Sequence, residues 1–345
     1  MVVFSRQKIK ALSACLDSAK SVVITAHKSP DADSVGSSLG LYHYLNQKGI
    51  PTKICHPDAA PEFLGWMAGQ KQIISHETDK QKCETLLSAA DLVFCLDYNS
   101  PNRVGKMEHP LMKSKAVRVM IDHHQEPDSD FCKITFSDPN CSSTSQMIYE
   151  LMDAMGDDKL LSKDIASCLY AGIMMDTGSF RFSSTSPKTH FVAGKLLETG
   201  IRQWEIHENI HDVNSVNRMR LNAFATLERL VVLSEYKTAY FHLGKRDLEK
   251  FSAVKGDTEG LVNSALALEG IRFAALFKEE SGLIKISFRS KGTIPVNLLS
   301  AAHFEGGGHT NAAGGKFIGN IQDAIAKFEE VLPAFFKQNR AKFKG

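Results

Sequence analysis

The chain has 345 residues, of which 43% are hydrophobic and 23% are charged, and its formal net charge is +2. This length and composition indicate a soluble globular protein of about two domains. They exclude a membrane-spanning protein, because no apolar run reaches the roughly 18 residues that a transmembrane helix needs. The N-terminus resembles an amphipathic helix rather than a signal peptide, so we expect a cytoplasmic protein.

Seven cysteines are present, none in a CxxC pair, which argues against a disulfide framework and a zinc ribbon. Charge is uneven: residues 1–215 hold 22 basic and 26 acidic side chains, and residues 216–345 hold 19 and 13. An acidic first part can hold cations, and a basic second part can attract a polyanion. Ordinary scatter of surface charge explains the same numbers equally well.

The first predicted strand is the β-branched run "SVVITAHK", which ends at His27. A helix, "DSVGSSLGLYHYLNQKG", follows and ends at Gly49. Three further apolar runs predict buried strands, with helical patterns between them. Strands that alternate with helices predict a parallel α/β sheet. The three runs are "PTKICH", "DLVFCLD", which ends at Asp97, and "KAVRVMIDHH", which ends in Asp122, His123 and His124.

Three helices are predicted next, and the first opens with a possible capping box from Ser143 to Gln146. The second helix carries Asp176 near its end. Residues 203–234 look helical and predict a connector to a second, smaller α/β domain. That domain has strands "TAYFHL", "IRFAALFKE" and "LIKISFRS" between helices near 245–251, 258–268 and 320–337. The expected limits are 1–205 for the first domain, 206–234 for the connector and 235–345 for the second domain.

Metal-ligand residue types end three of the predicted strands, at His27, Asp97 and Asp122-His123-His124. In open α/β sheets, this edge forms the ligand-binding crevice. Asp31 and Asp33 lie in the loop beyond the first strand, so we expect all of these residues, with Asp176, to converge. Ser34 and Gly36 would let the next helix begin beside the cluster, with its N–H groups facing anionic oxygens.

Carboxylates with a minority of imidazoles and no thiolate favour Mn²⁺, and Mg²⁺ or Fe²⁺ less well. Six ligands fit two ions that share one carboxylate, which is a recurring arrangement for phosphoryl chemistry. Each motif alone has an ordinary explanation, since "PDAD" is typical of an acidic turn and Asp or His often ends a strand. Only their combination supports a metal site.

The second domain contains "GGGHTNAAGG". Gly306 to Gly308 would let backbone N–H groups approach a phosphate closely, and His309 could donate a hydrogen bond to it. A glycine triplet alone more often forms a flexible turn.

The stretches "HKSPDADSVGS", "LDYNS", "IDHH" and "GIMMDTGSF" resemble the four motifs of the DHH phosphoesterase superfamily. "GGGHTNAAGG" resembles the signature of the DHHA1 domain. The resemblance spans residues 20–335 and is closest to the compact two-domain nano-RNases, NrnA-like oligoribonucleases that also act as pAp phosphatases. It departs from the usual pattern at Tyr98 and Asn99, where the family often has small residues.

The resemblance implies that His27 and Asp31 bind one Mn²⁺ ion and that Asp97 bridges to a second. Asp33, His123 and Asp176 would complete the coordination of the second ion. His124 would contact the phosphate or assist the leaving oxygen, and Asp122 would orient this segment. The implied substrate ligands are Arg289, Gly307, Gly308 and His309, while Arg103 could contact a phosphate or simply form a surface ion pair.

The implied activity is two-metal hydrolysis of short RNA oligonucleotides to mononucleotides and of 3′-phosphoadenosine 5′-phosphate (pAp) to AMP. A cyclic-dinucleotide phosphodiesterase would share these motifs and is the main alternative. A RecJ-like exonuclease, a family II pyrophosphatase and an exopolyphosphatase fit less well, and a non-catalytic nucleic-acid-binding protein is the alternative of another class. No membrane partner is indicated, and a homodimer stays open.

Overall fold

The computed structural model describes residues 3–254, 256–280 and 282–344. The chain divides into two compact units, Met1–Val213 and Asn214–Gly345. Within the described residues, every helix is too short or too polar to cross a membrane. The predicted connector, residues 206–234, holds most of the helix α8 (Gln203–His211), which belongs to the first unit. It also holds the helix α9 (Val216–Glu228) and the strand β7 (Leu230–Leu233), which belong to the second unit. A strand therefore forms at the end of the segment that the sequence pattern predicts as helical.

The first unit is built on a six-stranded sheet in which every described pairing is parallel. The strand order is β3-β2-β1-β4-β5-β6. Successive strands are added on one side of β1 as far as β3 and on its other side from β4 onward, so the topological switch point lies between β1 and β4. The predicted strands form as expected, and β3 and β6 are two short additions at the edges. The strands are β1 (Val22–Ala26), β2 (Thr52–His56), β3 (Ile73–Ser75), β4 (Leu92–Leu96), β5 (Val117–Asp122) and β6 (Ile134–Ser137).

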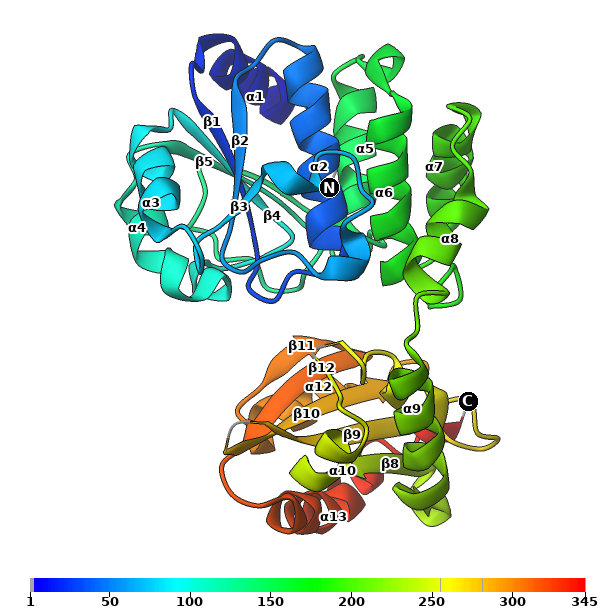
Figure 1. Cartoon of the computed structure of the whole chain (residues 1–345). Coiled ribbons are helices and arrows are strands. Elements are labelled where there is room, and N and C mark those ends of the chain that lie inside the picture. Colours follow the sequence, from blue (N-terminus) through cyan, green and yellow to red (C-terminus); the bar gives the residue numbers. More distant parts are fainter. Residues whose placement is uncertain (1–2, 255, 281, 345) are drawn as a thin grey trace. The chain divides into compact units, whose positions relative to one another are not determined.

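Helices cover both faces of this sheet, which is why its central strands are buried along their whole length (Figure 1). Ile24 and Phe94 pack with α1, α2, α5, α6 and α7, whereas Val23 and Val93 pack with α3 and α4 on the other face. The helices are α1 (Arg6–Ser18), α2 (Ala32–Gln47), α3 (Lys80–Ala89), α4 (Glu108–Lys113), α5 (Thr144–Ala154), α6 (Lys163–Asp176), α7 (Pro187–Glu198) and α8 (Gln203–His211).

Side-chain caps fix where the helices begin. Ser143 accepts a hydrogen bond from the Gln146 backbone at 3.0 Å, as the predicted capping box requires. The reciprocal bond is absent, because the Gln146 side chain contacts Ser142 and Glu150 instead. The helix α5 thus starts at the predicted place with half of the predicted cap.

Helices α2, α5 and α6 approach one another closely at three glycines. A Cβ on Gly36 would lie 2.4 Å from the Cys168 carbonyl oxygen, and one on Gly40 would lie 2.4 Å from Leu169. A Cβ on Gly172 of α6 would lie 2.1 Å from Ser145 Oγ and 2.8 Å from Asp33 Oδ1. This packing sets the positions of Asp33 on α2 and Asp176 on α6, the two acidic residues that these helices supply to the predicted site.

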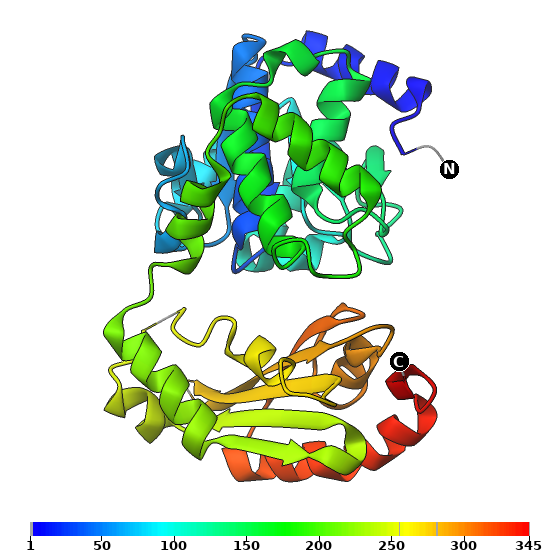
Figure 2. The same cartoon turned by 90° about the vertical axis from the view of Figure 1, so that its right-hand side faces the viewer.

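The second unit has a six-stranded mixed sheet of order β11-β12-β10-β9-β8-β7, in which only the β8–β9 pairing is parallel. Phe273 and Phe288 pack with residues of α12 and α13, and Ala274 and Leu276 pack with residues of α9 and α11. Helices therefore lie on both sides of this sheet (Figure 2). The remaining elements are β8 (Thr238–Leu243), α10 (Lys245–Lys250), α11 (Leu261–Ala265), β9 (Phe273–Glu280), β10 (Leu283–Ser290), α12 (Val296–His303), β11 (Gly307–His309), β12 (Ala312–Phe317) and α13 (Ile321–Gln338).

The glycine cluster forms a β-hairpin rather than a flexible turn. Gly307 pairs with Gly314, and His309 pairs with Ala312. A Cβ on Gly306 would lie 1.9 Å from the Gly314 carbonyl oxygen, and Gly308, with φ +139°, would bring its Cβ 2.5 Å from the Ala312 carbonyl oxygen. Gly306 and Gly308 are therefore required by the fold, whereas Gly307 has no atom within 4 Å of its would-be Cβ.

We expect Gly36→Ala to destabilise the first unit, since its Cβ would meet the backbone of α6. Overpacking of this kind costs about 1–3 kcal/mol. Gly194→Ala in α7 is the matched control, because no atom lies within 4 Å of that position. The control should raise the free energy of unfolding by about 0.5–1 kcal/mol, as alanine favours a helix. Urea titration of both variants measures the difference, and equal stabilities would contradict close α2–α6 packing.

Candidate active site

The predicted ligands meet at the carboxyl edge of the first sheet. His27 follows β1, Asp97 follows β4, and Asp122 is the last residue of β5. These three strands are adjacent, so their ends lie side by side (Figure 1). All three side chains are buried.

His27 is oriented by the backbone. Its Nδ1 lies 2.9 Å from the Lys28 carbonyl oxygen, a distance at which Nδ1–H donates a hydrogen bond. That tautomer leaves Nε2 as the ligand atom, 3.3 Å from Asp97 Oδ2 and 3.7 Å from Asp31 Oδ2. Asp31 also caps α2, with Oδ1 accepting from the backbone of Asp33 and Ser34. One oxygen of Asp31 therefore holds the helix, and the other faces His27.

Asp97 lies between two histidines. Its Oδ2 is 3.3 Å from His27 Nε2, and its Oδ1 is 3.4 Å from His123 Nε2. Thr144 donates a hydrogen bond to the same Oδ1 at 3.1 Å. The backbone of Asp97 has φ +62°, a strained conformation for a residue with a side chain, and such strain is frequent at functional sites.

Asp33 is held by the N-terminus of α5, not of its own helix. Its Oδ2 accepts from Thr144 N at 2.7 Å, and its Oδ1 accepts from Ser145 N at 2.8 Å. The N-terminus of α2 also lies beside the cluster, as the sequence predicts, and the N–H groups of Asp33 and Ser34 donate to the anionic oxygen of Asp31. The start of α5 supplies a second set of anion-binding N–H groups, which the sequence analysis did not predict.

His123 faces three carboxylates. Its Nε2 is 3.1 Å from Asp176 Oδ2, 3.4 Å from Asp97 Oδ1 and 3.9 Å from Asp33 Oδ2. Its Nδ1 lies 3.3 Å from the Cys141 carbonyl oxygen. The imidazole of His123 therefore has the same arrangement as that of His27, with backbone on one nitrogen and carboxylates on the other.

The buried Asp122 and the half-buried His124 form a pair, with Asp122 Oδ1 2.7 Å from His124 Nδ1. His124 Nδ1 is also 3.7 Å from Asp97 Oδ1. The carboxylate of Asp122 fixes the ring of His124 beside the metal-ligand cluster, which is the arrangement that orients a histidine for proton transfer.

The concentration of carboxylates shifts several pKa values. Burial and the negative charges of Asp97 and Asp176 raise the pKa of Asp33 well above its usual range. Burial opposes charge on His123, but Asp176 and Asp97 outweigh it and raise the pKa of that imidazole. Burial also disfavours ionised Asp97, yet hydrogen bonds from His123 and His27 hold its pKa low. Protons on the imidazoles thus offset a charge that a divalent cation would neutralise more fully.

Three groups of possible metal ligands among the described residues of the first unit contain Asp97, and two of them match the predicted ligand sets, while the third is Asp97, Asp122 and His124. One of the two matching groups is His27, Asp31 and Asp97, and the other is Asp33, Asp97 and His123. In each group, the ligand atoms lie within 4.8 Å of one another. Asp176 extends the second group through its contact with His123. Oxygen and imidazole donors without thiolate are suited to Mn²⁺ or Mg²⁺.

The predicted ligands of the second unit share one row of its sheet. Arg289 pairs with Ala312, and Ala312 pairs with His309, so the three side chains project from the same face. The Arg289 guanidinium donates a hydrogen bond to the Phe288 carbonyl oxygen at 2.9 Å, and burial lowers its pKa although the negative charge of Glu259 opposes this shift. Gly307 and Gly308 are exposed beside this row.

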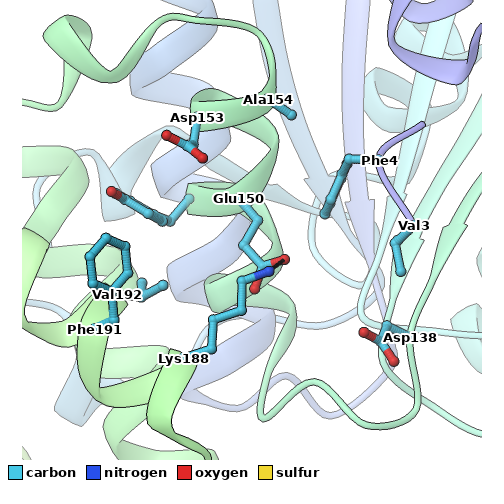
Figure 3. A pocket seen from close by; sticks show the side chains of 10 residues that line it. Val3, Phe4, Asp138, Glu150, Asp153, Ala154, Lys188, Phe191 and Val192 are labelled. Atoms are coloured by element: carbon cyan, nitrogen blue, oxygen red, sulfur yellow. Dashed lines mark ion pairs between the residues drawn. The ribbon is translucent and has the colours of Figure 1, made fainter. Parts of the chain in front are cut away.

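Arg103 lies in the 3₁₀ segment Pro101–Met107, and its side chain is exposed. Its carbonyl oxygen accepts a hydrogen bond from Lys28 N at 2.8 Å, so its backbone supports the loop that carries His27. A separate pocket of about 310 Å³ lies between the N-terminal segment, α5 and α7 and contains the ion pair of Glu150 and Lys188 (Figure 3). None of the predicted site residues lines it.

Comparison with known proteins gives two family matches. Residues 21–173 match the DHH family, N-terminal domain, and residues 237–334 match the DHHA1 domain. The bifunctional oligoribonuclease and PAP phosphatase NrnA of Bacillus subtilis is 32% identical over 295 residues, which is 85% of this chain and 88% of that protein. The cyclic-di-AMP phosphodiesterase GdpP of the same organism is 24% identical over 95% of this chain but only 50% of its own length.

A solved structure is similar over almost the whole chain. It is an exopolyphosphatase-related protein from Bacteroides fragilis, 36% identical, with a TM-score of 0.93 and coverage of 99% of this chain and 98% of that one.

We expect Mn²⁺ to stabilise the chain and Asp97→Asn to abolish most of that effect, because both ligand groups use Asp97. A ligand at 100 times its Kd adds about 2.7 kcal/mol to the free energy of unfolding. Thermal unfolding with Mn²⁺ or with EDTA measures the shift. Asp17→Asn, at an exposed position of α1, is the control with the same chemical change. An unchanged shift in Asp97→Asn would contradict the shared ligand.

Proposed function

This chain belongs to the DHH family of metal-dependent phosphoesterases, and from that premise we propose that it hydrolyses short oligoribonucleotides and pAp with two Mn²⁺ ions. The support comes chiefly from Asp97, whose two oxygens face His27 and His123 and which belongs to both ligand groups. A carboxylate placed in this way suits a pair of ions. A site for a single structural ion would need only one of the two ligand groups.

In this proposal His27, Asp31 and Asp97 hold the first ion. Asp97, Asp33, His123 and Asp176 hold the second. Two such ions activate water and neutralise charge on the phosphate oxygens. The chain keeps the ligands fixed through Lys28, Cys141 and the N-terminus of α5, whose hydrogen bonds orient His27, His123 and Asp33.

His124 is the proposed proton donor to the leaving oxygen, with Asp122 holding its ring. Arg103, exposed beside the loop of His27, is a second proposed phosphate contact.

The proposed role of the second unit is to bind one phosphate or nucleotide end. Arg289 supplies a cation on the sheet face, His309 flanks it across the small Ala312, and Gly307 leaves open space beside them. Guanidinium groups bind phosphate oxygens through paired hydrogen bonds. A substrate bound in this way needs a terminal phosphate or nucleotide end that the second unit can bind. Short RNA and pAp both have one.

A cyclic dinucleotide is the second candidate substrate, and the 95% coverage of this chain by the match with GdpP supports it. A cyclic substrate has no terminal phosphate for Arg289 and His309 to bind. The site therefore favours the linear substrates.

A panel of a dinucleotide RNA, pAp, pApA and c-di-AMP, each with Mn²⁺ or Mg²⁺, tests the proposed function. We expect AMP from pAp and mononucleotides from the RNA, fastest with Mn²⁺, and a loss of at least about 100-fold in kcat for Asp97→Ala because the shared ligand is gone. Asp17→Ala should retain full activity. Binding of these substrates without turnover would instead indicate a non-catalytic nucleic-acid-binding protein.

Gly307→Ala should weaken substrate binding without loss of stability, because open space surrounds its Cβ position and a phosphate would approach it there. A rise in KM for pAp of about tenfold, with kcat little changed, would correspond to about 1.4 kcal/mol of binding energy. Gly306→Ala is the structural comparison and should lower the melting temperature, since its Cβ would overlap Gly314. An unchanged KM in a folded Gly307→Ala protein would remove Gly307 from the site.

A further inference from the structure

The turn that follows α6 has an unusual backbone. Gly178, Ser179 and Phe180 have φ values of +55°, +58° and +64°, so three consecutive residues are left-handed and two of them carry side chains. Such conformations are costly for residues other than glycine and persist only where neighbouring groups enforce them. This turn therefore serves a purpose beyond linking α6 to α7.

Thr177 enforces the conformation. It is fully buried, and its Oγ1 accepts a hydrogen bond from Phe180 N at 3.0 Å. Its carbonyl oxygen accepts from both Arg181 N and Phe182 N at 2.9 Å. Phe180 adds an anchor, because its ring stacks on His190 of α7 with the centroids 5.3 Å apart. The turn is rigid as a result.

The rigid turn presents an exposed aromatic ring. The Phe182 side chain is 43% exposed. Its ring lies over Gly178, since a Cβ there would be 2.5 to 2.8 Å from three ring atoms. Arg181 beside it is exposed, and its Nε donates to the Gly178 carbonyl oxygen at 3.0 Å. The backbone thus places a ring and a guanidinium together on the surface.

This ring packs on a residue close in the chain to a proposed metal ligand. Gly178 is two residues beyond Asp176, whose Oδ2 is 3.1 Å from His123 Nε2. Packing of the ring on Gly178 therefore keeps Phe182 within one turn of a proposed metal ligand. A nucleotide whose phosphate is bound beside Asp176 carries its base only one sugar away from that phosphate, so an exposed ring held on this turn is a candidate base-binding group.

We propose that Phe182 is a stacking platform for the nucleobase adjacent to the phosphate that is cleaved, and that Arg181 contributes a positive charge to the same subsite. This inference rests on the proposed function. Stacking on an aromatic ring is tolerant of base identity because every base has a π-face. The platform would allow hydrolysis of short RNA of any sequence and would exclude phosphate esters that lack a base.

Calorimetric titration of AMP and of ribose 5-phosphate, which has the same sugar phosphate without the base, separates stacking from phosphate binding. We expect Phe182→Ala to weaken AMP binding about tenfold, a size typical of base–aromatic stacking, and to leave ribose 5-phosphate binding unchanged. Phe182→Trp should retain AMP binding. Phe191→Ala is the matched control, because Phe191 is 59% exposed on α7 at the pocket of Figure 3.

An equal loss for both ligands in Phe182→Ala would assign the ring a structural role and overturn the inference, as would no loss for either ligand. Melting temperatures of the variants confirm that each is folded. Because the titration measures binding, it decides the inference even if the wild-type chain fails to hydrolyse pAp, a result that would overturn the proposed function separately.

Discussion

The contact of the Asp97 carboxylate with His27 on one side and His123 on the other is the constraint on which the site depends. It joins ligands from three adjacent strands into one cluster, and it requires Asp97 to adopt a left-handed backbone at the end of β4. The parallel sheet makes this possible, because its strand ends lie at one edge and leave loops free to take strained conformations.

A cluster of four carboxylates would repel itself unless the surrounding structure held it. The hydrogen bonds from the start of α5 to Asp33 and from Ser34 to Asp31 reduce that repulsion, and the histidines offset part of the rest. The glycine contacts between α2 and α6 resist separation of the acidic residues. Cation binding and helix packing therefore act on the same elements, and loss of either should loosen both.

The sequence was sufficient to predict the parallel sheet, most of the helices and the convergence of the acidic and histidine residues, because buried strands and strand-end ligands leave strong local patterns. The helix α12 and the strands β11 and β12 were not predicted. It did not indicate the role of Thr144 and Ser145, which act through backbone N–H groups that any residue possesses. The capping pattern at Ser143 was the sequence signal that could have indicated this role, because it marks the N-terminus of a helix soon after β6. The strand β7 was missed because the helical pattern before it continues without a break.

The glycine cluster of the second unit shows why residue type alone cannot separate fold from function. Steric contacts require glycine at 306 and 308, where a side chain would meet the neighbouring strand, and such contacts cannot be read before the hairpin is known. Only Gly307 lies in open space beside the row of Arg289 and His309. Of the three glycines, this one is the candidate for direct phosphate contact, while its neighbours hold the strand that positions His309.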